Sequence, residues 1–194
     1  KPNDLAYTSI ALTPHTDNPY RKPIPCIQLL HCLENEVTDG LSTLVDGFAV
    51  AEYLKKNNHD LFKILTETKV RFRFVDKTII LENWGELIEL DHEKRIKQVR
   101  YSTRLDYVPA LEKTKLKKFY KARKLIANLY ASKKFEIRFK LEKGDLLMMD
   151  NHRLLHGRTS YNSHEGKRYL KGCYIDHDTT EGKLRYLERK FRIK

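Results

Sequence analysis

Short apolar runs bounded by Pro, Asn, Asp or Gly recur along the chain, a pattern typical of β-strands. Three runs lie before residue 50, four lie between residues 70 and 101, and three lie after residue 134. They are residues 8–15, 24–34, 42–48, 70–76, 78–83, 86–91, 95–101, 135–144, 145–157 and 167–176. The pattern predicts a protein that is mainly β.

Apolar residues at three- and four-residue spacing predict helices between these strands. One helix is expected over residues 47–57, a second over residues 59–65 with Asn58 as its cap, and a basic amphipathic helix from about Thr180 to Phe191. A longer stripe predicts one more helix and consists of Leu116, Phe119, Tyr120, Ile126 and Leu129.

Many short strands with a few inserted helices favour a mixed α+β architecture. We expect a distorted double-stranded β-helix, or jelly roll, with the helices packed outside it. No internal repeat, low-complexity tract or second-domain boundary divides residues 1–194, so we expect a single domain. Because the first residues read as the middle of a domain, we also expect an N-terminal segment to precede Lys1.

Composition narrows the class of protein further. Hydrophobic residues make up 40% of the 194 residues and charged residues 33%, which fits a folded domain with a sizeable core. No apolar run approaches the roughly 18–20 residues that span a bilayer, and no signal peptide opens the chain. Three cysteines at spacings that match no zinc or redox motif predict small buried side chains in a reducing cytoplasm.

The formal net charge of +12 has two possible explanations, a binding surface or solvated helix faces. A basic surface can bind nucleic acid or an anionic membrane. However, the lysines are mixed with acidic and apolar residues at helical spacing, as in residues 112–124 and 183–194. We therefore expect solvated helix faces, with neither a nucleic-acid nor a membrane partner.

Three residues form a candidate metal site. His15 and Asp17 are two positions apart, so in a strand their side chains lie on the same face. A second histidine, His156, follows far downstream in the segment DNHRLLHGR. Two histidines and one carboxylate form the facial triad that binds Fe(II) and leaves coordination positions open. The alternative for His156 is a hydrogen-bonded core histidine, and a lone His-x-Asp pair is weak by itself.

Two further residues extend this site. Arg168 lies a dozen residues beyond His156, where a 2-oxoglutarate dioxygenase binds the far carboxylate of its co-substrate. A guanidinium suits that task because it forms paired hydrogen bonds with a carboxylate. Ser42 could donate its hydroxyl to the same carboxylate. The alternative is that Arg168 is an ordinary arginine on a strand surface.

Longer stretches make a resemblance specific. Residues 15–54, with the motif IQLLHCLE…VDGF, together with DNHRLLHGRTSY and RYLKGCYIDHD, resemble the gamma-butyrobetaine and trimethyllysine dioxygenase family within the taurine-dioxygenase-like group. The resemblance implies a jelly-roll catalytic domain that uses Fe(II), 2-oxoglutarate and O2. It makes His15, Asp17 and His156 the iron ligands, and Arg168 and Ser42 the 2-oxoglutarate contacts. It also allows a homodimer assembled through helices.

The resemblance extends to the substrate, because the family hydroxylates small molecules that carry a trimethylammonium group. Tyr7 and Tyr174 match positions of its aromatic cage, where cation–π attraction would hold the ammonium. Their alternative is ordinary core packing. Asp4 stands where the family has an Asn, and its carboxylate would favour a cation. These residues predict hydroxylation of a small quaternary ammonium compound similar to gamma-butyrobetaine.

Several positions depart from the family pattern and keep other substrates open. Ser102 and Thr103 replace an Asn pair, and Leu41 replaces an acidic residue. A sulfonate, phosphonate or alkyl sulfate is therefore an alternative substrate, although Gly172 stands where taurine-type enzymes carry an Arg. A nucleic-acid demethylase is disfavoured because Tyr174 replaces its second Arg. A non-enzymatic jelly-roll binding module is disfavoured by the complete triad.

Overall fold

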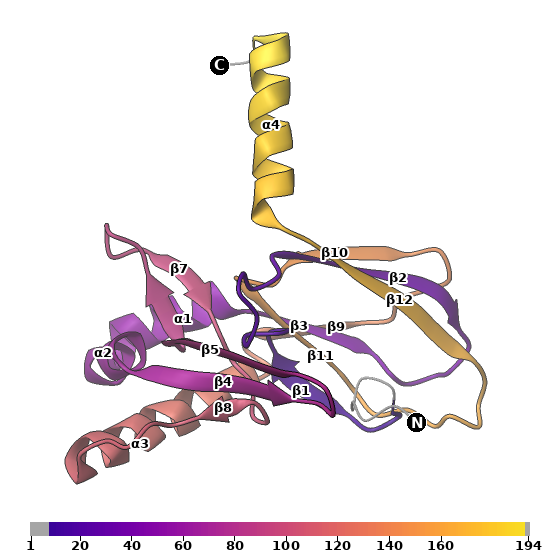
Figure 1. The fold of residues 1–194 in the computed structure, drawn as a ribbon. Helices are drawn as coiled ribbons and strands as arrows, with labels where there is room; N and C mark the ends of the chain where they lie inside the picture. Colours follow the sequence, from indigo (N-terminus) through magenta and orange to yellow (C-terminus); the bar gives the residue numbers. More distant parts are fainter. Residues whose placement is uncertain (1–7, 193–194) are drawn as a thin grey trace.

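The computed structural model describes residues 8–192. In Figure 1 two facing sheets lie beside a group of helices and further strands, and one helix, α4, projects from the body. The strands are β1 (Leu12–His15), β2 (Ile27–Asn35), β3 (Ser42–Asp46), β4 (Lys69–Val75), β5 (Ile80–Glu86), β6 (Ile88–Leu90), β7 (Ile96–Val99), β8 (Asp106–Tyr107), β9 (Glu136–Phe139), β10 (Leu146–Asp150), β11 (Leu154–Arg158) and β12 (Arg168–Ile175). The helices are α1 (Gly47–Asn57), α2 (His59–Glu67), α3 (Lys113–Tyr130) and α4 (His177–Phe191).

Two antiparallel sheets form the jelly-roll part of the fold. One sheet has the strand order β1-β11-β3-β9, and the other has the order β10-β2-β12. Strands that are far apart in sequence are therefore neighbours, because β1 pairs with β11 and β2 pairs with β12. This topology places strands from the early and late parts of the chain side by side.

The remaining strands pack with the first three helices. β5-β4-β8 form a three-stranded sheet, and β6 and β7 form a hairpin. The core lies where α1, α2 and α3 meet these strands, and it includes the fully buried side chains of Leu54, Phe72, Phe119, Ile126 and Tyr130. The helices therefore support the jelly roll from one side (Figure 1).

Local sequence explains where α1 and α3 begin. The Asp46 carboxylate accepts hydrogen bonds from the backbone N–H groups of Phe48 and Ala49, and so caps α1. Glu112 caps α3 in the same way through the N–H groups of residues 114 and 115. Asn58 is the N-cap residue of α2, as expected, but its side chain makes no capping hydrogen bond.

The apolar stripe predicted for α3 needs one correction. Phe119 and Ile126 are buried as expected, but Tyr120 is 51% exposed. Ala122 and Tyr130 complete the buried face instead, because the spacing 119, 122, 126, 130 follows the helical repeat more closely.

A tight corner divides a segment that the sequence pattern predicts as one strand. Residues 145–157 form β10 and β11, which belong to different sheets. The Asp150 side chain accepts a hydrogen bond from the His152 N–H, and the Asp150 carbonyl accepts one from Arg153. This local turn carries the chain from one sheet to the other and positions His156.

The last helix lies apart from the body. α4 begins at His177, three residues before the predicted start, and none of its described residues is buried. Across residues 8–192, the helices lack the combination of length and apolar character that crossing a membrane requires.

Candidate metal centre

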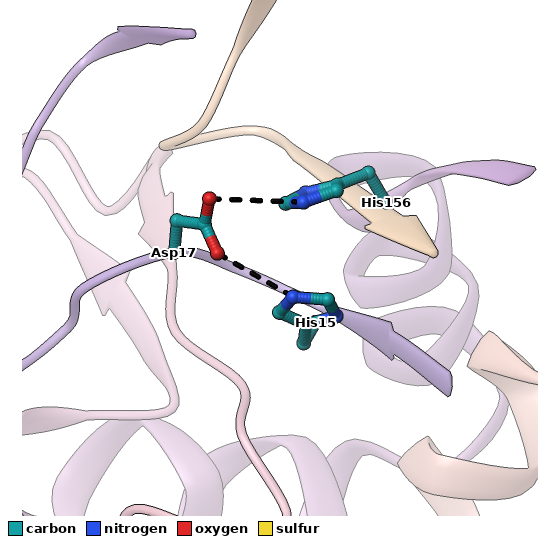
Figure 2. A group of neighbouring side chains, drawn as sticks. All are labelled: His15, Asp17 and His156. Carbon is teal, nitrogen blue, oxygen red and sulfur yellow. Dashed lines mark ion pairs between the residues drawn. The ribbon is translucent and has the colours of Figure 1, made fainter. Parts of the chain in front are cut away.

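The structure brings His15, Asp17 and His156 together at the junction of β1 and β11 (Figure 2). His15 is paired with His156 across the two strands, and their ring centroids are 4.5 Å apart. Asp17 Oδ1 lies 3.4 Å from His15 Nε2, and Asp17 Oδ2 lies 3.7 Å from His156 Nε2. One ligand atom from each residue lies within 4.8 Å of the other two. Side chains 141 residues apart in the sequence thus converge on one point.

A glycine next to His156 permits this approach. A Cβ atom at Gly157 would lie 2.5 Å from the backbone oxygen of Leu12 and 2.8 Å from Thr43 Oγ1. Both contacts are closer than real Cβ atoms make, so a side chain here would push β1 or β3 away from β11. The glycine therefore lets the strand that carries His15 pack closely against the strand that carries His156.

Hydrogen bonds determine which histidine nitrogen faces the centre. His15 Nδ1 lies 2.8 Å from the Thr13 carbonyl oxygen, which can only accept, so Nδ1 carries the hydrogen. In the neutral ring, His15 Nε2 is then the lone-pair nitrogen, and it faces Asp17. This is the arrangement that supports metal-ligating histidines in proteins.

Two side chains hold one oxygen of Asp17. Gln28 Nε2 donates to Asp17 Oδ2 at 2.7 Å, and the Tyr174 hydroxyl donates to the same oxygen at 2.6 Å. Gln28 comes from β2 and Tyr174 from β12, so the β10-β2-β12 sheet holds the Asp17 carboxylate in place. Oδ1 is left free to act as the metal ligand.

A buried amide fixes the backbone of Asp17. Asn151 Oδ1 accepts from the Asp17 N–H at 2.7 Å, and Asn151 Nδ2 donates to the Asp17 carbonyl at 3.0 Å and to the Pro25 carbonyl at 2.9 Å. Asn151 is 1% exposed. Neither Gln28 nor Asn151 was expected from the sequence. Only the position of Asn151 in the DNHRLLHGR segment hinted at it.

Charge at the centre suits a cation. Burial alone would raise the pKa of Asp17, but the neighbouring His15 and His156 rings and the Tyr174 hydrogen bond hold it well below its ordinary value. Burial, together with His15, lowers the pKa of His156 to about 4. Partial burial and the adjacent carboxylate raise the pKa of Tyr174, so its hydroxyl keeps the proton that it donates. Near neutral pH Asp17 is therefore ionised and His156 neutral, which are the forms that bind metals.

The predicted 2-oxoglutarate contacts lie in a second group of residues. Arg168 Nη2 donates to the Gly40 carbonyl at 3.4 Å, two residues before Ser42 on β3. Ser42 is buried and lies opposite Arg158 in the β3–β11 register. The Arg158 and Arg168 guanidiniums lie 5.0 Å and 5.4 Å from the centroid of the Tyr161 ring. Two guanidiniums and a buried hydroxyl are thus gathered beside Gly40.

Arg168 fits an anion better than a solvated strand surface. Burial and the neighbouring Arg158 lower the pKa of Arg168, and its Nε is buried without a hydrogen-bond partner in the described structure. Gly40 has φ +72°, and a Cβ atom there would lie 3.2 Å from Arg168 Nε and 3.2 Å from Tyr161 Cβ. A carboxylate bound here would supply the missing acceptor and offset the two positive charges.

The structure locates only part of the predicted substrate site. Tyr174 is 43% exposed, and its hydroxyl is bound to Asp17, a contact that the sequence did not indicate. Tyr7 and Asp4 lie outside the described residues. His152, in the corner after β10, contacts the Ile24 carbonyl and His177 and does not join the triad.

The donor set also fits the metal named from the sequence. Two imidazole nitrogens and one carboxylate oxygen converge from one side, as Fe(II) requires in a facial triad. Within residues 8–192, Asp17 is contacted by two histidines, two amides and a phenol, and by no lysine or arginine that would neutralise it. A divalent cation is the natural counter-charge for this group.

Comparison with known proteins gives the same class. The fold is similar to the solved structure of asparagine oxygenase in complex with Fe(II), 3-hydroxyasparagine and succinate, with a TM-score of 0.68 and 16% identity over 86% of this chain and 50% of that one. This likeness confirms the predicted jelly roll. A family model described as "Taurine catabolism dioxygenase TauD, TfdA family" matches residues 1–174. The chain belongs to this family of Fe(II)- and 2-oxoglutarate-dependent dioxygenases.

Curated relatives confirm the narrower resemblance. The chain is 37% identical to human gamma-butyrobetaine dioxygenase over 193 residues, which cover 97% of this chain and 50% of that protein. It is 34% identical to trimethyllysine dioxygenase of Meyerozyma guilliermondii over 190 residues, 95% of this chain and 47% of that protein. The chain therefore spans about half the length of these relatives.

Proposed function

We propose that the protein hydroxylates a small quaternary ammonium compound, using Fe(II), 2-oxoglutarate and O2. The observation that carries the proposal is the convergence of His15, Asp17 and His156 within 4.8 Å. When bound, the iron and the co-substrate supply the oxidising chemistry, in which 2-oxoglutarate loses CO2 to become succinate while a C–H bond of the substrate is hydroxylated.

The protein's own side chains place these groups. His15, Asp17 and His156 would hold the iron from one side, while Gln28 and Tyr174 keep Asp17 in position. Arg168 would bind the far carboxylate of 2-oxoglutarate through paired hydrogen bonds, with the Ser42 hydroxyl nearby. In this scheme no acid–base pair is needed, and positioning and the exclusion of water are the protein's main contributions.

Two observations favour a quaternary ammonium substrate. The relatives named for gamma-butyrobetaine and trimethyllysine both act on trimethylammonium compounds, and they match nearly the whole chain. In addition, the half-exposed Tyr174 ring lies beside Asp17, where it could contact a cation close to the iron. Tyr7 and Asp4 would complete the cation site. A homodimer and a cytoplasmic location stay predictions.

Succinate release from the whole protein tests the proposal. With Fe(II), 2-oxoglutarate and O2 present, we expect gamma-butyrobetaine or trimethyllysine to increase succinate formation above the uncoupled rate. Asp17→Ala should abolish both rates, whereas His31→Ala, which removes an exposed histidine of β2, should leave them unchanged. Stimulation by taurine or an alkyl sulfate, and not by trimethylated amines, would contradict the substrate class while leaving the oxygenase class intact.

A further inference from the structure

A second group of metal-ligating side chains lies at one end of the β10-β2-β12 sheet. Cys26 precedes β2, Asp150 ends β10, and His177 begins α4 just after β12. Asp150 and Ile175 both pair with Ile27, so the sheet register itself brings these three residues to the same edge. One ligand atom from each of Cys26, Asp150 and His177 lies within 4.8 Å of the other two.

Hydrogen bonds through His152 leave the Nδ1 atom of His177 available to bind a metal. His152 Nε2 lies 3.1 Å from the Ile24 carbonyl, which can only accept, so the neutral ring accepts at Nδ1. His177 Nε2 lies 3.1 Å from that Nδ1 and must therefore carry a hydrogen. The lone pair of the neutral His177 ring is then on Nδ1. This chain of contacts orients a ligand histidine as outer-shell partners do in metal sites.

The groups near His177 match a metal ligand set. Glu181 Oε1, one turn further along α4, lies 3.7 Å from Nδ1. Asp150 uses Oδ1 to accept from the His152 N–H, which leaves Oδ2 free. Cys26 is 1% exposed, and within the described part of the chain its thiol has no hydrogen-bond partner, whereas the Cys32 thiol donates to the Leu141 carbonyl.

We propose that Cys26, Asp150, His177 and Glu181 bind one zinc ion, separate from the iron centre. A thiolate, an imidazole and carboxylates are zinc ligands. Ligand atoms of Cys26, Asp150 and His177 already lie within 4.8 Å of one another, and Glu181 Oε1 lies 3.7 Å from His177 Nδ1. Binding would release the Cys26 thiol proton to solvent. Four protein ligands make the site structural and not catalytic.

The position of the cluster indicates its role. α4 has no buried residue and projects from the jelly roll (Figure 1). Its first residue and a residue one turn later would both be zinc ligands, while Asp150 ends β10 and Cys26 directly precedes β2. The ion would therefore fix the start of α4 to the jelly roll, a task for which α4 has little apolar packing.

Cobalt titration of the metal-free whole protein tests this site, because cobalt bound to a thiolate gives a charge-transfer absorption band. We expect two bound equivalents, one of them with the thiolate band. Asp17→Ala should keep the band and lose the other equivalent. Cys26→Ala should lose the band and keep the iron-centre equivalent. Cys173→Ser, which changes an exposed cysteine on β12, is the matched control and should keep both.

Further variants separate metal binding from folding. His177→Gln, at a partly exposed position, should weaken the thiolate-associated equivalent at least tenfold, and His152→Ala should weaken it roughly 10–100-fold. Zinc should slow hydrogen exchange at the start of α4 in the wild type and not in His177→Gln. A wild-type protein without the thiolate band, or a band that persists in Cys26→Ala, would overturn the proposal.

Discussion

At the scale of single residues, the centre is defined by the groups behind the ligands as much as by the ligands themselves. Asp17 accepts two side-chain hydrogen bonds on Oδ2, and the Asn151 amide hydrogen-bonds to both its backbone N–H and its carbonyl. His15 is oriented by the Thr13 carbonyl. Each contact reduces the conformational freedom that metal binding would otherwise have to remove, so the site is organised before the metal arrives.

Removing one donor to Asp17 should weaken iron binding without unfolding the protein. We expect Tyr174→Phe to raise the Fe(II) dissociation constant roughly 10–100-fold, because outer-shell partners contribute to metal affinity on that scale. Anaerobic calorimetric titration would measure it. Tyr169→Phe changes an exposed tyrosine of the same strand and should have no effect. Equal affinity in both variants would show that Gln28 alone holds the carboxylate.

The same tyrosine tests the cation site. Tyr174→Phe keeps the ring face, whereas Tyr174→Leu removes it, so only the second variant should raise the KM for a trimethylammonium substrate. The expected loss from the missing ring is about 1–2 kcal/mol if the ammonium is desolvated there. Steady-state kinetics with the amine varied and 2-oxoglutarate saturating would separate the two variants. If both variants raise the KM alike, the ring does not contact the cation.

Arg168→Ala should raise the KM for 2-oxoglutarate far more than that for the amine. Losing one partner of a desolvated charge pair costs about 2–5 kcal/mol. Arg168→Lys should recover only part of this, since an ammonium offers a point charge and not a fork. Arg138→Ala, which removes an exposed arginine of β9, is the control. Unchanged co-substrate kinetics in Arg168→Ala would assign the carboxylate to Arg158 or Lys167.

At the scale of elements, one buried ion pair attaches α3 to its neighbouring sheet. Arg123 of α3 donates to both oxygens of Asp106 on β8, through Nε at 2.9 Å and Nη2 at 2.8 Å. The Asp106 side chain is 2% exposed. This pair joins the longest helix to the β5-β4-β8 sheet, which in turn packs beside the jelly roll (Figure 1).

Arg123→Leu should lower the free energy of unfolding by about 3–5 kcal/mol, because it leaves the Asp106 carboxylate buried without a counter-charge. Urea denaturation followed by circular dichroism would measure it. Lys63→Ala removes an exposed i,i+4 partner of Glu67 and should change stability by less than about 0.5 kcal/mol. A similar small effect in Arg123→Leu would mean that water reaches Asp106 and solvates it.

At the scale of the whole molecule, the iron centre lies where β1, an early strand, pairs with β11, a late strand. β1 supplies His15, β11 supplies His156, and the second sheet supplies Gln28 and Tyr174. The ligands therefore converge when β1 pairs with β11, whereas the side chains that hold Asp17 reach it only when the second sheet is also in place. Loss of iron binding in a destabilised variant would accordingly follow the loss of global structure.

Thiol reactivity reports this global structure. Cys173 is exposed, whereas Cys26 and Cys32 are buried, and burial together with nearby carboxylates raises the pKa of Cys26 to about 12. In metal-free folded protein we expect Cys173 to react rapidly with a thiol reagent, and Cys26 and Cys32 to react only after unfolding. The Cys173→Ser variant should lack this rapidly reacting thiol. Fast reaction of the buried pair would indicate that the sheet opens locally.

The sequence alone was enough to predict the mainly β class and the helices α1, α2 and α3, because these depend on local apolar spacing and capping. It also indicated His15, Asp17 and His156, since two ligands lie two residues apart, a second histidine follows far downstream, and the family resemblance strengthened the set. Tyr120 was misplaced, because one position of helical phase decides burial and tertiary packing decides the phase.

The tertiary structure decided what surrounds these residues. Gln28, Tyr174 and Asn151 contact Asp17 only because β2, β12 and the corner after β10 are brought beside β1, and no local pattern encodes that pairing. Likewise, Cys26, Asp150 and His177 match no spacing motif and meet only through the β10-β2-β12 register. Local sequence determines elements through short-range sterics and hydrogen bonding, whereas groups of side chains distant in sequence form only when strand pairing closes long loops.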